Sequence, residues 1–199
     1  MNLVITGDGS HSIYIPELNE HYHSSFGAIT ESLHVFVRSG LQCFPADKPV
    51  TILEIGFGTG LNALLTAIDC LQKERTILYY GLEKNPLSAA LTDSLNYPAL
   101  LDQKLLPDDL FKTIHQIPWN EMIQIAHGFY LEKIHDDLLT WNPDFSYDLV
   151  YFDAFAPDKQ HEMWSQEIFT RLADRLNPGG ILVTYCVKGL VKQMLRNTG

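Results

Sequence analysis

The feature that most limits the fold of this chain is a set of glycines between an apolar run and a helical stretch. In "VTILEIGFGTGLNALL", residues 50–65, Gly56, Gly58 and Gly60 follow a run that predicts a buried strand and precede one that predicts a helix. Glycines at such a turn let a ligand approach the backbone and the helix N-terminus, because no Cβ stands in the way. The pattern predicts a strand–turn–helix unit with a ligand site at the turn.

After Val50, short apolar runs alternate with helical stretches, which is typical of a mostly parallel, twisted α/β sheet. The strands of this sheet are predicted at 50–55, 76–83, 129–134, 146–152 and 181–186. Residues 122–126 are expected to pair with 129–134 as a hairpin. Helices are predicted at 61–72, 86–95, 161–176 and 189–197, with a turn at 177–180 and short or irregular structure at 97–119.

The N-terminal part has a different pattern. Residues 3–6 and 10–16 flank a Gly-Asp-Gly turn and predict a β-hairpin, and the apolar spacing at 28–41 predicts an amphipathic helix. We therefore expect a hairpin-and-helix extension at 1–48 and a Rossmann-like core at 49–199.

Charge and cysteine content restrict the class of protein. The net charge of -10 argues against a generally basic surface, so a nucleic-acid partner needs a local basic patch or one supplied from elsewhere. Cys43, Cys70 and Cys186 form no Cys-x-x-Cys pair, which disfavours a disulfide framework or a thiolate zinc site. With no apolar run of about 18 to 20 residues, the chain is expected to be cytoplasmic and to have no membrane span.

Acidic residues end the predicted strands. Glu54 precedes the glycines, Glu83 ends the second strand, Asp136 and Asp137 follow the third, and Asp153 ends the fourth. Each alone also fits a helix cap, a loop acid or a turn residue. Together, at the carboxyl edge of one sheet, they favour an adenosyl ligand. Glu54 suits a cationic sulfonium and ammonium, and an acid about 20 residues past the glycines suits ribose hydroxyls.

The histidines give a weaker signal. His21 and His23 form a His-x-His pair, and one interpretation adds His11 and His34 as further metal ligands. No acid or cysteine lies at a helpful spacing, so no metal site is expected. The interpretation that we favour places these histidines at a substrate mouth or on the surface.

Longer motifs, "GFGTGLNALL", "GLEKNPL", "DLVYFDAFAP", "MWSQEIF" and "LNPGGILVTY", together with "DGSHSIYIPELNEHYHS", carry a more specific resemblance. The chain resembles the class I methyltransferases, dependent on S-adenosylmethionine, that complete 5-methylaminomethyl-2-thiouridine at the wobble position of bacterial tRNA. The family includes stand-alone and bifunctional forms. The resemblance implies a Rossmann-like class I fold and a tRNA substrate. It is also compatible with a flavin-dependent oxidase on a separate chain as a partner.

By position, the resemblance implies roles for individual residues. Gly56, Gly58, Gly60 and Asn62 would shape the S-adenosylmethionine loop, Glu83 would hold the ribose, Asp137 would contact adenine, and Asp153 would lie beside the transferred methyl. Asp153 would orient the acceptor amine, take its proton or stabilise the ammonium that develops. Phe155, and Trp164 in one of two equally weighted interpretations, would stack on the extruded base. The other interpretation of Trp164 is a core residue.

The chain departs from the family in one respect. Members usually continue into a further strand pair with a basic, glycine- and proline-rich stretch, whereas this sequence stops at "LRNTG". We expect that strand pair to be absent from this chain. Alternatives remain open: methylation of a small-molecule or protein amine, which the negative charge favours, or a non-catalytic adenosyl-binding module. A nicotinamide-dependent dehydrogenase disagrees with the glycine spacing and with Glu54.

Overall fold

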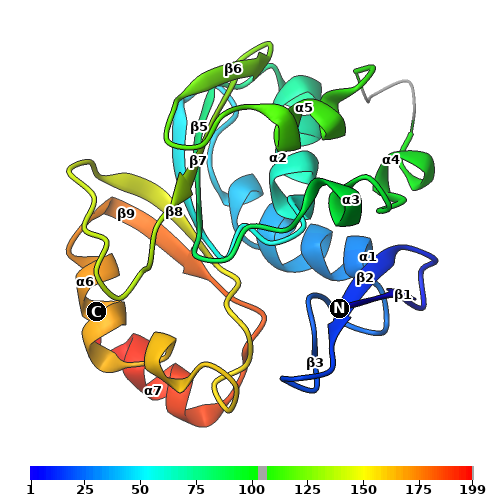
Figure 1. The fold of residues 1–199 in the computed structure, drawn as a ribbon. Helices are drawn as coiled ribbons and strands as arrows, with labels where there is room; N and C mark the ends of the chain where they lie inside the picture. The colour runs from blue at the N-terminus through cyan, green and yellow to red at the C-terminus, as the bar shows by residue number, and fades with distance from the viewer. Residues whose placement is uncertain (103–106, 199) are drawn as a thin grey trace.

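The computed structural model describes residues 1–102 and 107–198, and it contains a small antiparallel sheet and a larger mixed sheet (Figure 1). The small sheet has the order β1-β2-β3, with bounds Asn2–Ile5, His11–Ile15 and Glu20–His21. The β1–β2 pairing, with Asn2 opposite Tyr14, confirms the predicted hairpin. The short strand β3 was not predicted. It is followed by the loop that carries Tyr22 and His23.

The large sheet has the order β6-β7-β5-β4-β8-β9. Its strands are β4 (Val50–Ile55), β5 (Ile77–Glu83), β6 (Ile123–Ala126), β7 (Phe129–His135), β8 (Tyr147–Phe152) and β9 (Leu176–Val183). All neighbours pair in parallel except β6, which runs antiparallel to β7. Along the chain, β5, β7 and β6 are added on one side of β4, and β8 and β9 are then added on its other side. Ligands of open α/β sheets bind at the carboxyl ends of the strands beside such a reversal. The predicted Rossmann-like architecture is confirmed.

The helical segments are α1 (Ala28–Ser32), η1 (Leu33–Arg38), η2 (Leu41–Cys43), α2 (Leu61–Lys73), α3 (Ala89–Thr92), α4 (Tyr97–Leu100), α5 (Leu110–Gln116), η3 (His161–Met163), α6 (Gln166–Ala173) and α7 (Gly189–Thr198). α1 runs directly into η1, a stretch with the wider π-helical turn, so the helix predicted at 28–41 is present in a modified form. Of the stretch from 97 to 119, residues 103–106 lie outside the described residues. Within residues 1–102 and 107–198, no helix has the length and apolarity to cross a bilayer.

Three predicted boundaries were wrong. The helix predicted at 86–95 is only the short α3. The helix predicted at 161–176 starts at Gln166, because the Ser165 side chain accepts a hydrogen bond from the Ile168 amide and caps it there. Residues 177–180 are not a separate turn. They form a bulge within β9, whose register to β8 shifts between Leu176 and Ile181, and β9 ends at Val183 instead of residue 186.

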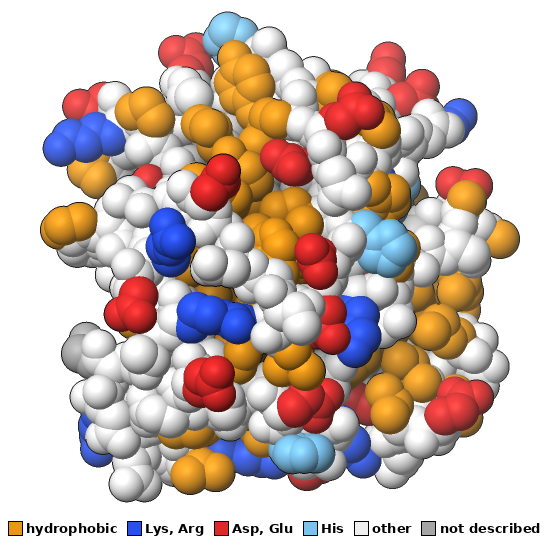
Figure 2. All heavy atoms as spheres, turned by 60° about the vertical axis from the view of Figure 1, so that its left-hand side comes forward, with side chains coloured by type: hydrophobic (Ala, Val, Ile, Leu, Met, Phe, Trp, Pro, Cys, Tyr) orange, Lys and Arg blue, Asp and Glu red, His pale blue; other side chains and the backbone are white. Residues whose placement is uncertain are grey.

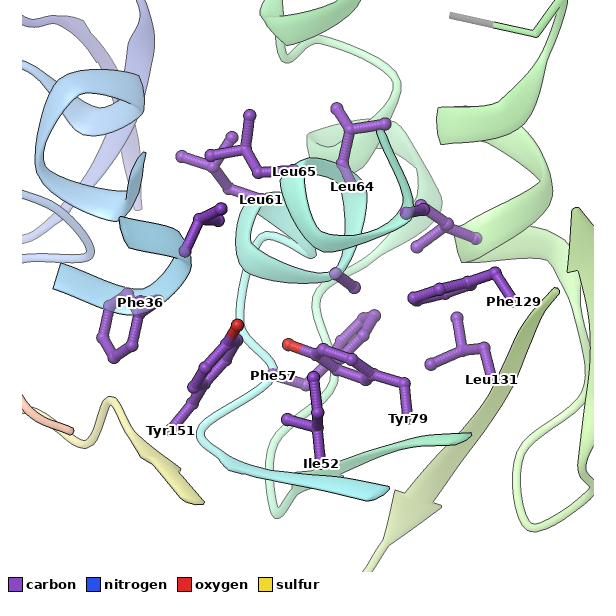
Figure 3. Close-up of a cluster of buried hydrophobic side chains, with 14 of the residues drawn as sticks. Phe36, Ile52, Phe57, Leu61, Leu64, Leu65, Tyr79, Phe129, Leu131 and Tyr151 are labelled. Atoms are coloured by element: carbon purple, nitrogen blue, oxygen red, sulfur yellow. The ribbon is translucent and has the colours of Figure 1, made fainter. Parts of the chain in front are cut away.

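Alternating side chains of the sheet form two apolar clusters, one on each face. On one face, α2 covers residues such as Ile52, Tyr79 and Tyr151, and Figure 3 shows these side chains beneath the helix. On the other face, residues such as Leu53 and Phe152 pack with side chains of α6 and α7. The sheet is therefore buried on both sides, which explains why its strands are continuous apolar runs in the sequence.

The N-terminal part shares the first cluster. Its buried residues from β2, α1, η1 and η2 are Ile13, Ala28, Phe36, Val37 and Leu41. The rings of Phe36 and Tyr151 lie 5.1 Å apart between centroids, which ties η1 to the centre of the sheet. Residues 1–48 and 49–199 therefore meet in one apolar core, although they differ in sequence pattern.

Candidate functional site

A cavity of about 430 Å³ lies at the carboxyl ends of β4, β5, β7 and β8. The glycine turn forms part of its wall, and the N-terminal segment with Tyr22 and His23 forms another part. Predicted site residues that line it are Gly56, Gly58, Asn62, Glu83, Asp137, Asp153 and Phe155. Glu54, Gly60 and Trp164 do not line it. The structure thus brings together most of the side chains that the sequence placed at strand ends.

The glycine turn is shaped by close approaches that a side chain would prevent. Gly56 has φ of 86°, and a Cβ there would lie 2.7 Å from the carbonyl oxygen of Asp153. Gly58 has φ of 51°, and its Cβ would lie 3.1 Å from the Tyr22 ring. Both positions need glycine, because L residues rarely adopt this backbone region. The turn therefore packs directly against both the β8 end and the N-terminal loop.

Glu83 holds the glycine turn in place. Its carboxylate accepts a hydrogen bond from the Gly58 amide at 3.0 Å and another from the Asn85 amide at 2.8 Å. Because each carboxylate oxygen has two lone pairs, Glu83 keeps acceptor capacity towards the cavity that it lines.

Glu54, Asn62 and Asp153 are linked by hydrogen bonds, with Asn62 and Asp153 in the wall of the cavity and Glu54 behind them. The Asn62 amide nitrogen donates to Glu54 and to Asp153, each at 2.9 Å. Glu54 is fully buried, and burial raises its pKa well above the ordinary value, although the hydrogen bond from Asn62 opposes the rise. The sequence argument treated Glu54 as a direct partner of a cationic ligand. Its position behind Asn62 makes it a residue that orients Asn62 instead.

Within the described part of the protein, the buried Oδ1 of Asn62 accepts no hydrogen bond. A buried acceptor without a donor is costly, so a ligand donor at Asn62, which lines the cavity, would be favourable.

Asp153 follows the last residue of β8 and lies where two cavities meet. Burial raises its pKa to about 7, with the hydrogen bond from Asn62 opposing the rise and the charge of Glu31 adding to it. A carboxyl group with a pKa near neutrality can both hold and release a proton at physiological pH.

The second cavity measures about 340 Å³ and lies between the N-terminal loop and the segment after β8. Its walls shared with the first cavity are Tyr22, His23, Asp153, Ala154 and Phe155. The rings of Tyr22 and Phe155 meet edge to face, with centroids 5.0 Å apart. The sequence pointed to His21 and His23 as a possible substrate mouth, and both line this cavity. It did not single out Tyr22, Glu31 or Tyr185, because their approach to Asp153 depends on tertiary packing.

Two predicted residues have other surroundings than expected. Trp164 is 4% exposed, contacts the rings of Phe152 and Phe169, and donates its indole N–H to the Phe155 carbonyl at 2.7 Å. Trp164 is a core residue that supports the Phe155 segment, which agrees with the second of the two interpretations of Trp164 and not with base stacking. Asp137 lines the first cavity, where Lys84 contacts it at 2.8 Å and lowers its pKa.

Metal-ligand geometry is lacking in residues 1–102 and 107–198, where no group of three or more His, Cys, Asp or Glu side chains could hold an ion. His23 instead contacts the Thr59 hydroxyl at 2.7 Å, and burial lowers its pKa to about 4.

Comparison with known proteins shows which proteins this chain is similar to. The model of the S-adenosyl-L-methionine-dependent methyltransferase family matches residues 108–199. The structure of MnmC2 from Aquifex aeolicus superimposes with a TM-score of 0.81 at 25% identity, covering 100% of this chain and 64% of that one. Over residues 108–199 the chain is similar to the S-adenosyl-L-methionine-dependent methyltransferases, and its whole length superimposes on MnmC2.

Curated relatives are longer proteins. The tRNA 5-methylaminomethyl-2-thiouridine biosynthesis bifunctional protein MnmC of Pseudoalteromonas atlantica is 32% identical over 89% of this chain and 28% of its own length. The protein of the same name from Burkholderia mallei is 30% identical over 99% of this chain and 32% of its own length. The chain thus spans about a third of the relatives that it matches.

The residues fit the cofactor that the family description names. The two glycines leave the backbone open to a ligand, Glu83 offers acceptors for hydroxyl donors, and Asn62, which lines the cavity, has a side-chain oxygen without a donor. S-adenosylmethionine carries ribose hydroxyls and an ammonium, which are donors of these kinds.

Proposed function

We propose that this protein transfers a methyl group from S-adenosylmethionine to the aminomethyl group of 5-aminomethyl-2-thiouridine at the wobble position of tRNA. The observation that carries the proposal is the place of Asp153 at the junction of two cavities, one of which contains the glycine turn. Such an arrangement suits a reaction in which two bound molecules meet at one carboxylate. The names of the curated relatives support the tRNA nucleoside as the acceptor.

The first cavity would hold the cofactor. Its lining includes Gly56, Gly58, Asn62, Glu83 and Asp137. When bound there, S-adenosylmethionine supplies an electrophilic methyl group on a sulfonium. Gly60 would act through its backbone, since it begins the helix α2 behind the turn, and Glu54 would act through Asn62.

Asp153 would prepare the acceptor amine. An alkylamine is an ammonium at neutral pH and cannot attack until it loses a proton, so a carboxylate at the junction serves as acceptor for that proton. A pKa of about 7 keeps Asp153 largely ionised in mildly alkaline solution and makes it more basic than an ordinary aspartate. Phe155 and Tyr22 offer aromatic surface for the extruded base.

Charge and partners are the part of the proposal that depends most on the relatives. The net charge is -10, and Figure 2 shows acidic side chains spread over one face with Lys and Arg side chains separated from one another. Contacts to the tRNA backbone would therefore be local.

We also propose a cytoplasmic location, where tRNA is modified, and a flavin-dependent oxidase activity, on the same or a separate chain, that supplies the free amine.

The test is methyl transfer from radiolabelled S-adenosylmethionine to tRNA from a bacterial strain that lacks the final methylation. We expect label in the wobble nucleoside with the unmodified protein, a loss of at least about 100-fold with Asp153→Asn, and full activity with the exposed control Asp144→Asn. Transfer that is unaffected by Asp153→Asn would contradict the catalytic role. Label in a small-molecule or protein amine instead of tRNA would favour the second candidate, which the acidic net charge supports.

A further inference from the structure

We propose that the second cavity is the acceptor pocket and that Glu31, together with Asp153, selects acceptors that carry a positively charged aminomethyl group. The inference rests on the proposed function, which places the cofactor in the first cavity. It deepens that function, because it names a specificity residue and the charge state in which the acceptor binds.

The first step of the argument is the charge of the cavity. Its walls include the carboxylates of Glu20, Glu31 and Asp153, and no Lys or Arg is among the described residues that line it. His23 also lines it but is neutral at physiological pH, because burial lowers its pKa to about 4. Carboxylates that share a partly buried space without a cation repel one another, and a bound ammonium relieves that repulsion.

The second step is the position of Glu31 itself. Glu31 lies on α1, and its Oε2 accepts a hydrogen bond from the Ser24 amide at 3.0 Å. In the described part of the chain its other oxygen, Oε1, accepts no hydrogen bond. The charge of Glu31 reaches across the cavity, since it raises the pKa of both Asp153 and Tyr185. Glu31 and Asp153 therefore line the same cavity and lie close enough for their charges to interact.

The third step is the shape of the pocket. Tyr22, Phe155 and Tyr185 add aromatic walls, and the Tyr185 hydroxyl donates to the Ala154 carbonyl at 2.9 Å, which fixes the segment after Asp153. A pocket lined by both aromatic rings and carboxylates suits a planar ring that bears a short cationic arm. A neutral hydroxymethyl arm of the same size would leave the carboxylates unneutralised.

A purely structural role for Glu31 is the competing explanation, because its hydrogen bond to Ser24 holds the N-terminal loop. Glu31→Gln separates the two roles, since the glutamine side-chain oxygen still accepts from Ser24 while the negative charge is lost. Glu17→Gln removes the same charge from an exposed position of the N-terminal part that lines neither cavity, and serves as the matched control.

The experiment compares benzylamine with its neutral isostere benzyl alcohol as ligands of the full chain saturated with S-adenosylhomocysteine, by NMR titration at about pH 8. We expect benzylamine to bind at least about ten-fold more tightly than benzyl alcohol, as a charge-assisted contact implies. Glu31→Gln should reduce this preference to less than about three-fold, whereas Glu17→Gln should keep it. S-adenosylhomocysteine affinity and the melting temperature should stay unchanged in Glu31→Gln.

The inference is overturned if the unmodified protein shows no preference for the amine, or if Glu31→Gln retains it. Should Glu31→Gln fail to fold, Asp153→Asn tests the same pair of charges by the same preference. If the protein binds no S-adenosylhomocysteine, the proposed function is contradicted. The inference about the acceptor pocket is then still tested, because the preference for benzylamine can be measured in the absence of S-adenosylhomocysteine. If label is transferred to an acceptor other than tRNA while the preference for the amine is retained, the acceptor pocket is supported and the tRNA substrate is not.

Discussion

Asp153 is half-buried and yet has to be ionised to accept a proton, and these two conditions oppose each other. Burial raises its pKa to about 7, so the carboxyl is protonated below that pH and cannot take a proton from the acceptor. We predict that kcat/KM for methyl transfer falls about ten-fold per pH unit below pH 7 and levels off above it. Because the charge of Glu31 contributes to the raised pKa of Asp153, Glu31→Gln should shift this acidic fall in kcat/KM to lower pH.

A pH–rate profile between about pH 5 and 9, with tRNA as acceptor, measures this fall. Asp144→Asn, at an exposed position, should leave the profile unchanged. A flat profile across this range would show that Asp153 does not exchange a proton during turnover.

Glu83 and Glu54 are glutamates near the same turn with different expected effects. Glu83 lines the first cavity and binds the Gly58 amide, so Glu83→Gln should weaken S-adenosylhomocysteine binding by roughly 10- to 100-fold. Glu54 lines no part of that cavity, and its raised pKa favours the neutral acid. Glutamine still accepts from Asn62, so Glu54→Gln should cost less than about ten-fold. Calorimetry on both variants measures the difference, and equal losses would mean that Glu54 contacts the ligand directly.

At the level of elements, the hairpin turn between β1 and β2 caps a helix that is distant in sequence. Asp8 Oδ2 accepts from both the amide and the hydroxyl of Thr30 at 2.9 Å, and Oδ1 accepts from the Ser10 amide. Burial alone would raise the pKa of Asp8, but the hydrogen bonds from Ser10 and Thr30 outweigh it and lower the pKa. The Gly-Asp-Gly turn therefore does more than reverse the chain: it fixes the start of α1, which carries Glu31.

Asp8→Ala should destabilise the protein by roughly 1 to 2 kcal/mol, the usual cost of losing a helix cap. Because the folded-state pKa is depressed, the stabilisation is present above the unfolded-state pKa of about 4 and is lost as the pH falls further. Urea unfolding at about pH 7 and pH 3 measures this, with the difference between Asp8→Ala and the unmodified chain expected to shrink at the lower pH. A difference that persists unchanged at pH 3 would exclude the charged cap as its origin.

The sequence predicted elements best where a single local signal determines them. β4, β5, β7 and β8 are buried on both faces and appear as apolar runs, so their positions and the acids at their ends were predictable. The start of α6 depends on the Ser165 cap, and the core position of Trp164 depends on a contact with Phe155. The second cavity depends on the loop after β3 meeting the segment after β8, and no periodicity in either segment predicts that meeting.

On the scale of the whole molecule, the N-terminal part and the sheet are expected to unfold together. Removing residues 1–48 would take Ile13, Ala28, Phe36, Val37 and Leu41 from the shared apolar cluster. At about 1.5 to 3 kcal/mol for each large side chain, the loss approaches roughly 10 kcal/mol, which is comparable with the total stability of a typical domain.

We predict that a 49–199 fragment shows no cooperative thermal transition by near-ultraviolet circular dichroism. Residues 1–48 supplied as a separate polypeptide should restore part of it. A fragment that melts cooperatively near the temperature of the full chain would mean that 1–48 is a dispensable extension. The acceptor pocket, whose walls come from both parts, would then assemble only after each part had folded.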